Sequence, residues 1–220
     1  MINFNNPTRF WIIGAGRFGR IAVSRILRNI PGAEIRLVDK QPVIIDDTRV
    51  RTIQADGIDW LETMINHEDM PVDMIVPAIP IHVAAEWLKR KLSCMYKIFP
   101  TAIPDDCLAS LPNAVKGDAD RIYISHADFI CPDTCPEPET ICTVTGKHRP
   151  LDLFRLLENF SCENYLPLVV RSHQLFPGVG GIHPESLSKL LDAALQNSHR
   201  PLMIGTACRC NGVMDFLQLA

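Results

Sequence analysis

The sequence predicts an α/β protein in which helices cover a parallel β-sheet, followed by a smaller α/β lobe. Short apolar segments alternate with amphipathic segments through the first 100 residues, which is typical of repeated strand–helix–strand units. A glycine-rich turn ends the first apolar segment and begins the first amphipathic one. The chain has 220 residues, 47% of them hydrophobic and 21% charged, so it can bury a sizeable core.

The first half contains the elements of one sheet. Apolar stretches predict five strands, at residues 8–13, 34–38, 50–54, 72–76 and 95–99. Apolar residues at helical spacing predict the helices between them, at residues 17–30, 57–64 and 84–92. Asp56 is placed to cap the second of these helices. We expect the five strands to lie parallel in one sheet.

A domain boundary is predicted at Asp118, so that residues 1–118 form the larger unit and residues 119–220 the smaller lobe. In the lobe, the pattern predicts strands at residues 121–125, 168–170 and 202–205, and helices at 153–160 and 184–194. Residues 129–150 lack periodicity and contain four prolines and three cysteines. A loop of this length inside a compact domain is usually functional.

The glycine-rich turn has the spacing of a dinucleotide-binding site. It consists of Gly14, Ala15, Gly16, Arg17, Phe18 and Gly19. The first glycine allows a tight turn, the second lets a pyrophosphate approach the backbone, and the third lets the helix pack closely on the sheet. The free N–H groups and the positive dipole at the start of the helix attract phosphates. A glycine turn that has lost its ligand is the alternative.

An acidic residue stands at the expected distance from this turn. Asp39 follows Gly19 by 20 residues and ends the second predicted strand. A carboxylate there accepts hydrogen bonds from the adenosine ribose hydroxyls and repels a 2′-phosphate. The position therefore predicts NAD rather than NADP as the cofactor, and the adjacent Lys40 weakens that preference slightly.

These residues resemble the Rossmann-type NAD-binding family, which implies a Rossmann-like, doubly wound parallel sheet that binds NAD. The stretch from Ile12 to Gly19 is particularly similar to the RCK-type nucleotide-binding domains that regulate potassium uptake. The run from Asp73 to Glu86 is similar to the fourth strand and following turn of glucose–fructose oxidoreductase-like dehydrogenases. Those enzymes usually carry Glu-Lys-Pro after the fifth strand, where this chain has Tyr96 to Pro100, so the match fails at the catalytic lysine. The resemblance ends near residue 100.

Five of the eight cysteines cluster in two segments of the smaller lobe. They are Cys131, Cys135, Cys142, Cys208 and Cys210. In a reducing compartment, clustered cysteines indicate metal or redox chemistry more often than structural disulfides. The spacings match neither zinc-ribbon pairs nor the bacterial ferredoxin run, so the set predicts a metal site for which an iron–sulfur cluster and zinc are both candidates. A thiol–disulfide pair and incidental buried thiols are the alternatives.

Weaker candidates lie outside these motifs. The remaining cysteines, Cys94, Cys107 and Cys162, are expected to be core or partly buried thiols. His82 follows the fourth predicted strand, where it is either an acid–base group near the nicotinamide or a helix-start residue without a catalytic role.

Further polar residues flank the cysteine-rich segment. His126 and Asp128 lead into it and are candidate additional metal ligands, although a lone histidine is more often structural. Arg171 and His173 either hold an anionic substrate or face solvent.

Two classes of function follow from these features. The first is an NAD-dependent oxidoreductase with a cysteine-ligated metal or iron–sulfur site at the junction of the two units, although no catalytic residue is identified. The second is a non-catalytic, NAD-responsive regulatory module, as the RCK-type resemblance implies. The first predicts a polar pocket near the cysteines, and the second predicts an exposed apolar patch instead. The expected partners are the dinucleotide and either a small-molecule substrate or a protein. The sequence leaves the oligomeric state undecided, with a homodimer as one alternative.

Charge and hydropathy argue against two other classes. The formal net charge of −3 is unlike that of a general nucleic-acid binder. No apolar run approaches the roughly 18 residues of a membrane span, so membrane insertion is not expected. The segment from Met1 to Pro7 is polar and has no apolar signal-peptide core, which predicts a cytoplasmic protein.

Overall fold

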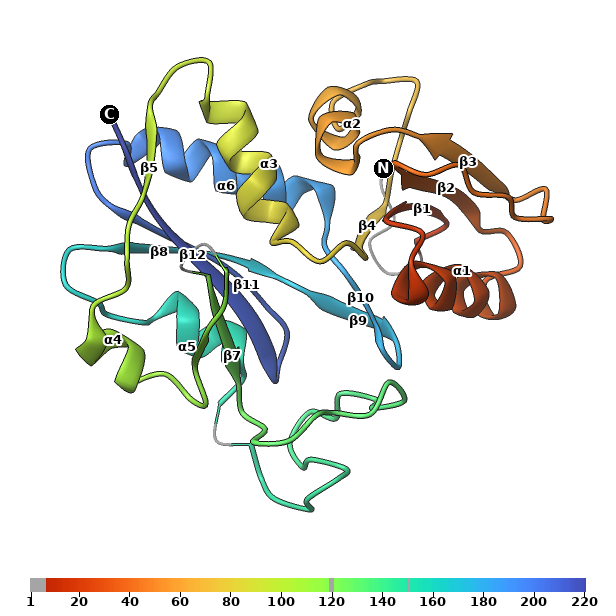
Figure 1. Cartoon of the computed structure of the whole chain (residues 1–220). Coiled ribbons are helices and arrows are strands. Elements are labelled where there is room, and N and C mark those ends of the chain that lie inside the picture. The colour runs from red at the N-terminus through yellow and green to blue at the C-terminus, as the bar shows by residue number, and fades with distance from the viewer. Residues whose placement is uncertain (1–6, 119–120, 150) are drawn as a thin grey trace.

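Two β-sheets, joined by a helix that packs on both, make up a mixed α/β structure (Figure 1). The computed structural model describes residues 7–118, 121–149 and 151–220. The first sheet is parallel and comes from the N-terminal part of the chain, whereas the second is mixed and contains the C-terminal strand.

Four parallel strands form the first sheet in the order β3-β2-β1-β4. They are β1 (Arg9–Ile13), β2 (Glu34–Asp39), β3 (Val50–Gln54) and β4 (Met74–Pro77). The helices that connect them are α1 (Arg17–Asn29) and α2 (Gly57–Met64). Asp56 caps α2 as predicted, since its carboxylate accepts from the backbone N–H groups of Ile58 and Asp59 at 2.8 and 3.0 Å.

Alternate residues of β1 bury opposite faces of this sheet. Phe10 and Ile12 belong to a core that includes the apolar side of α1. Trp11 and Ile13 belong to a second core that includes α2, the following helix and part of the second sheet. Because a strand points successive side chains to opposite faces, the apolar run from Phe10 to Ile13 in β1 requires cover on both faces of the sheet.

The second sheet has the strand order β6-β7-β12-β11-β8, with β5 also paired to β12. Its strands are β5 (Ile98–Pro100), β6 (Val115–Lys116), β7 (Ile122–Ser125), β8 (Leu166–Arg171), β11 (Leu202–Ala207) and β12 (Asn211–Leu219). The helices around it are α3 (Val83–Leu92), α4 (Asp105–Ala109), α5 (Leu153–Glu158) and α6 (Pro184–Gln196). A hairpin of β9 (His173–Phe176) and β10 (Val179–Gly181) reaches back to the first sheet, where Ile182 bridges Ile75 of β4.

The predicted fifth parallel strand is wrong. Residues 98–100 pair antiparallel with residues 217–219 of β12, so this segment belongs to the second sheet. The nine-residue β12 was not predicted from the sequence. Asn211-Gly212 at its start is typical of a hairpin turn and was the local signal that could have indicated it. The chain changes sheets between β4 and β5, and residues 119–120, beside the predicted boundary at Asp118, lie outside the described residues.

Two of the weaker cysteine expectations also need correction. Cys107 and Cys162 are buried as expected but form a disulfide within the core of the second sheet. Their separation of 55 residues in the chain gave no local signal of this pairing. Cys94 is exposed at the end of α3 rather than packed in a core.

A buried polar cluster, here called the clamp, joins α3 to the second sheet. His82 Nδ1 lies 2.6 Å from Asp215 Oδ2, and His82 Nε2 lies 2.8 Å from Thr206 Oγ1. Since a carboxylate can only accept, Nδ1 donates to Asp215 and Nε2 accepts from Thr206. The other oxygen of Asp215 accepts from Lys89 Nζ at 3.1 Å and Arg121 Nη2 at 3.3 Å. The clamp therefore connects α3, β7, β11 and β12.

Charge within the clamp favours an ionised aspartate beside a neutral histidine. Burial alone would raise the pKa of Asp215, but the hydrogen bonds from His82 and Arg121 and the charge of Lys89 lower it overall. Burial lowers the pKa of His82 more than Asp215 raises it. Because Lys89 and Arg121 already balance the carboxylates of Asp215 and Glu86, a proton on His82 would add an uncompensated buried charge.

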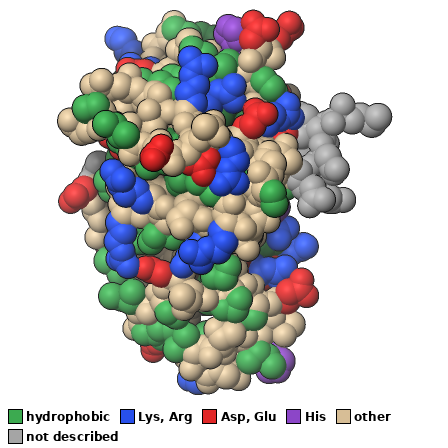
Figure 2. All heavy atoms as spheres, turned by 90° about the vertical axis from the view of Figure 1, so that its right-hand side faces the viewer, with side chains coloured by type: hydrophobic (Ala, Val, Ile, Leu, Met, Phe, Trp, Pro, Cys, Tyr) green, Lys and Arg blue, Asp and Glu red, His purple; other side chains and the backbone are tan. Residues whose placement is uncertain are grey.

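The face of the molecule drawn in Figure 2 carries charged side chains of both signs. Basic and acidic side chains are interspersed on that face. Among the described residues, no helix is both long and apolar enough to cross a membrane.

We expect Asp215→Asn to lower the free energy of unfolding by about 3 kcal/mol, because Arg121 and Lys89 would then share the Glu86 carboxylate in place of two carboxylates. Urea denaturation followed by circular dichroism measures this. The matched control is Asp105→Asn, whose side chain is 93% exposed and whose nearest cation lies 3.5 Å away. An equal shift of the urea midpoint in both variants would contradict the stabilising role of the clamp.

Candidate functional site

The glycine turn between β1 and α1 leaves an open space at its middle glycine. Gly14 has a φ of 106°, and a side chain there would collide with the Ala78 carbonyl. A Cβ on Gly19 would overlap the Gly14 carbonyl, so both outer glycines are required by the fold itself. A Cβ on Gly16 would meet nothing within 4 Å. The middle glycine is therefore not explained by packing.

Among the described residues, no side-chain hydrogen bond caps the start of α1. Gly16 is the N-cap residue and makes no side-chain hydrogen bond, and the first turn contains no acidic residue. The positive end of the helix is therefore uncompensated by its own first turn. Phe18 in this turn is 51% exposed.

Asp39 lies at the end of β2, next to the glycine turn, as predicted. One carboxylate oxygen accepts from the Ala15 backbone N–H at 2.7 Å, and the other accepts from that of Gln41 at 2.8 Å. Lys40 points to a different partner, because its Nζ lies 2.8 Å from the Asp56 carboxylate. That hydrogen bond raises the pKa of Lys40.

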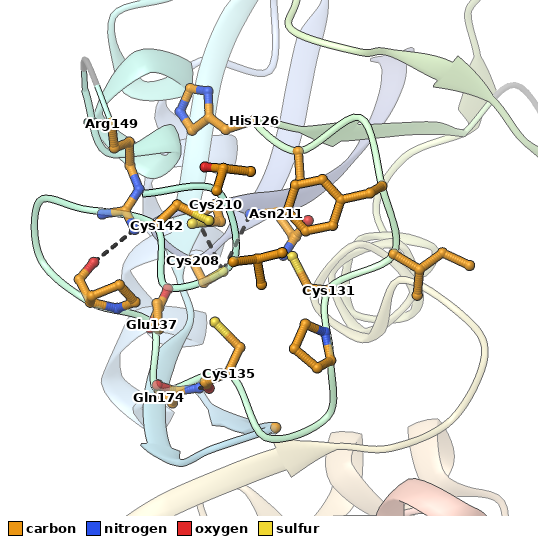
Figure 3. Close-up of a pocket in the computed structure, with 18 of the residues that line it drawn as sticks. His126, Cys131, Cys135, Glu137, Cys142, Arg149, Gln174, Cys208, Cys210 and Asn211 are labelled. Carbon is orange, nitrogen blue, oxygen red and sulfur yellow. Dashed lines mark hydrogen bonds between the residues drawn. The ribbon is translucent and has the colours of Figure 1, made fainter. Parts of the chain in front are cut away.

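The fold brings the five clustered cysteines to one cavity of about 660 Å³ (Figure 3). Three come from residues 126–149, here called the cysteine loop, and two come from the turn between β11 and β12. Phe18 of the glycine turn lines the same cavity, together with the β9–β10 turn. The two motifs found in the sequence therefore border one space. The cysteines are Cys131, Cys135, Cys142, Cys208 and Cys210.

The cysteine loop is anchored to α1. Arg17 forms an ion pair with Asp133 of the loop. Arg25 donates to the backbone carbonyls of Asp133 and of Pro177 in the β9–β10 turn. Gly178 packs so closely under the loop that a Cβ would collide with the Asp133 carbonyl. These contacts fix the cysteines relative to the glycine turn.

Buried side chains on the other side hold the remainder of the loop. Arg149, whose side chain is only 4% exposed, donates to the carbonyls of Pro138 at 2.7 Å and Glu139 at 2.9 Å. Gln174 Nε2 donates to the Cys135 carbonyl at 2.7 Å. Gln174 was not among the sequence candidates, because a single Gln near a loop carries no distinctive pattern.

The thiols differ in environment. Burial and the nearby Glu137 raise the pKa of Cys208 to about 12. Hydrogen bonds from the Thr145 side chain and from the backbones of Thr145 and Val144 lower the pKa of Cys142. Burial and the neighbouring Cys135 raise the pKa of Cys131. One cavity thus contains one thiol with a lowered pKa, Cys142, beside two with raised pKa values, Cys131 and Cys208.

No set for a single metal ion is assembled in this cavity. In residues 7–118, 121–149 and 151–220, no three His, Cys, Asp or Glu side chains form a group that could hold an ion. The predicted metal site therefore stays a prediction, supported so far by the convergence of its five residues.

The weaker candidates differ in whether they line the cavity. His82 is buried in the clamp and does not line the cavity. His126 and Asp128 do line it, and His126 Nε2 is buried without a hydrogen-bond partner in the described part of the chain. Arg171 stacks on the Phe154 ring at 4.3 Å. Burial, Arg171 and His183 lower the pKa of His173 to about 4, so His173 is neutral at pH 7.

Comparison with known proteins found one matching family and one similar full-length protein. Residues 84–220 match the family described as "Uncharacterized protein, C-terminal domain". The chain is also similar to an "Uncharacterized protein" of Archaeoglobus fulgidus, with 30% identity over 227 residues that cover 95% of this chain and 99% of the archaeal one. No solved structure matches. The similarity extends over both sheets and the cysteine loop.

We expect Gly178→Ala to release the cysteine loop from α1, whereas Gly146→Ala should not. Both glycines have positive φ values, 65° and 68°, so both variants carry the same backbone cost. A Cβ meets atoms only at Gly178, and that overlap should lower the free energy of unfolding by about 1–3 kcal/mol more. Limited proteolysis should cut the loop faster in Gly178→Ala. Equal cleavage of the two variants would contradict this packing.

Proposed function

We propose that this chain, which belongs to the family described as "Uncharacterized protein, C-terminal domain", binds NAD(H) at the glycine turn and acts as an oxidoreductase in the adjoining thiol-lined cavity. The observation that carries the proposal is the glycine turn itself. It is open where a pyrophosphate would approach, and it borders a cavity large enough for a small substrate.

The first sheet supports a Rossmann-like fold. The order β3-β2-β1-β4 is the order of the first half of dinucleotide-binding α/β sheets, with α1 and α2 on opposite faces. In such sheets the ligand lies outside the carboxyl ends of the strands. Gly14 follows β1 at that edge, and Asp39 ends β2 at the same edge.

The residues present fit a pyrophosphate at the start of α1. Free backbone N–H groups and the helix dipole favour an anion there, and no acidic side chain in the first turn competes for them. The space beside Gly16 would accommodate the closest phosphate oxygens. Bound NAD(H) would supply hydride transfer, while the chain supplies binding and orientation.

Asp39 and Lys40 support NAD over NADP. Each Asp39 oxygen accepts one backbone N–H, which leaves further acceptor capacity for the ribose hydroxyls. The carboxylate would repel a 2′-phosphate. Lys40 is held by Asp56, so its ammonium group is not free to offset that repulsion.

The cavity favours an enzyme over a purely regulatory module. A hydride-transfer enzyme needs an enclosed space beside the cofactor, and the cavity extends from Phe18 to the cysteine loop. An NAD-responsive regulator is the second candidate, because the Arg17–Asp133 ion pair connects the glycine turn directly to the loop. Oxidation of bound NADH by small carbonyl substrates under single-turnover conditions would distinguish the two.

We predict that Gly16→Val weakens NADH binding by about 100-fold or more, equivalent to about 2.7 kcal/mol, because its side chain would occupy the space of the pyrophosphate. Isothermal titration calorimetry measures the dissociation constant. The fold should tolerate the change, since a Cβ at Gly16 meets no atom within 4 Å.

The matched control is Gly32→Val. Gly32 also has open space for a Cβ, but it lies beyond the opposite end of α1. Binding of NADH should be unchanged in this variant. Unaltered affinity in Gly16→Val would overturn the assignment of the glycine turn as the pyrophosphate site.

For Asp39→Ala and Asp39→Asn we expect the preference for NAD over NADP to fall by about tenfold or more, because each removes the charge that repels a 2′-phosphate. Asp39→Asn keeps an oxygen for the Ala15 N–H and so controls for the shape of the turn. Competition binding of the two nucleotides gives the ratio. If the preference persists in both variants, Asp39 does not contact the ribose.

A further inference from the structure

We propose that the cavity beneath the cysteine loop holds an iron–sulfur cluster, ligated by thiolates from the loop and from the β11–β12 turn. This inference deepens the proposed function by assigning a cofactor class to the thiols. It rests on residues of the second half and does not require nucleotide binding at the glycine turn.

The first argument is convergence. Cys131, Cys135 and Cys142 approach the cavity from the loop, and Cys208 and Cys210 approach it from the turn, as Figure 3 shows. Cys131 is near enough to Cys135, Cys142 and Cys210 for their charges to interact. Because the two segments are far apart in the chain, only the tertiary structure gathers these side chains.

The second argument is size. Four thiolates around one zinc ion lie about 3.8 Å apart, since each Zn–S bond is about 2.3 Å long. The described residues contain no group of three ligands that could hold one ion. In a cluster of four irons and four sulfides each thiolate binds a different iron, so the ligands surround a wider inorganic core. The five thiols line a cavity of about 660 Å³, which has room for such a core.

The third argument is the presence of hydrogen-bond donors to the sulfurs. Cys208 Sγ accepts from the backbone N–H groups of Cys210 at 3.4 Å and Asn211 at 3.3 Å. Cys142 Sγ likewise accepts from the backbones of the residues two and three positions later, Val144 and Thr145. Both turns thus present the same pattern of two N–H donors to one sulfur. Such bonds stabilise ligating thiolates and tune the cluster that they hold.

The remaining thiols have side-chain donors. Asn211 donates to Cys131, and Arg149 donates to Cys210. Arg149 is buried and also holds two carbonyls of the loop, so the same cation orders the loop and offsets thiolate charge. Donors and charge are therefore in place before any metal binds.

Assembly of the cluster is a ligation step. Each ligating thiol exchanges its S–H bond for an S–Fe bond and releases one proton. Ferrous and ferric ions in equal number and inorganic sulfide come from solution, so the cluster assembles with no change in the oxidation state of iron or of the cysteine sulfurs. Four ligands complete a cluster, so one of the five thiols is in excess. We assign Cys131, Cys142 and Cys208 to the ligand set, with the fourth ligand from Cys135 or Cys210.

The test uses the full chain, purified without oxygen, stripped with a chelator and reconstituted with iron salts and sodium sulfide. We expect about four iron and about four acid-labile sulfide per chain after desalting, with an electron paramagnetic resonance signal on reduction. Uptake of one zinc or iron per chain without sulfide would overturn the proposal. Failure to retain any metal would also overturn it.

Single variants then locate the cluster. Cys131→Ser, Cys142→Ser and Cys208→Ser should each lose most of the iron and sulfide while circular dichroism stays unchanged. Cys94→Ser is the matched control, because Cys94 is exposed and lies outside the cavity. Equal iron loss in Cys94→Ser, or full retention in the other three, would contradict the site.

The Gly16→Val variant separates this proposal from the nucleotide site. It should keep its full iron and sulfide content even where NADH binding is lost. Failure of NADH binding in the unmodified chain would therefore leave the cluster result standing, and the reverse also holds.

Discussion

The buried carboxylate of Asp215 fixes α3 on the second sheet, and α3 also packs against the first sheet. Asp215 lies on β12 and is contacted by His82 and Lys89 around α3 and by Arg121 before β7. Around it, apolar residues of α3, α6 and both sheets form one continuous core. A charged group at such a site is costly unless every partner is present, so the clamp tolerates few alternative packings.

With the sheets fixed, the cysteine loop has anchors on two sides. Arg17 and Arg25 of α1 hold its first part, and Arg149 and Arg209 hold its second. A loop of this length would otherwise lose much conformational entropy on ordering. Arg25 and Arg149 donate to backbone carbonyls of the loop, and Arg17 and Arg209 pair with its carboxylates. The loop is therefore part of the folded structure even though it has no regular secondary structure.

The proximity of the glycine turn to the thiols gives the proposed function its physical basis. Phe18 belongs to the turn and to the wall of the cavity. A dinucleotide at the start of α1 would therefore lie next to the Arg17–Asp133 ion pair that anchors the loop. A bound nucleotide and the cysteine loop would then both contact the start of α1. Nucleotide binding would therefore be coupled to the arrangement of the thiols, whichever chemistry occurs in the cavity.

Several features were predictable from the sequence because they follow from local rules. The strands of the first sheet, the cap at Asp56 and the requirement for glycine at positions 14 and 19 follow from periodicity and backbone sterics. The position of Asp39 beside the turn follows from its place at the end of β2. The clustering of five cysteines in two segments made them candidates, but the sequence left open whether the two segments meet in space.

Other features were decided only by the tertiary structure. Pairing of β5 with β12, the Cys107–Cys162 disulfide and the His82–Asp215 contact all join segments that are distant in the chain. Local periodicity contains no information about which distant segments become neighbours, since that choice depends on how whole sheets pack. The sequence by itself determined the glycine turn, its acidic partner and the identity of the thiols. Only the packing of the two sheets placed the thiols around one cavity beside that turn.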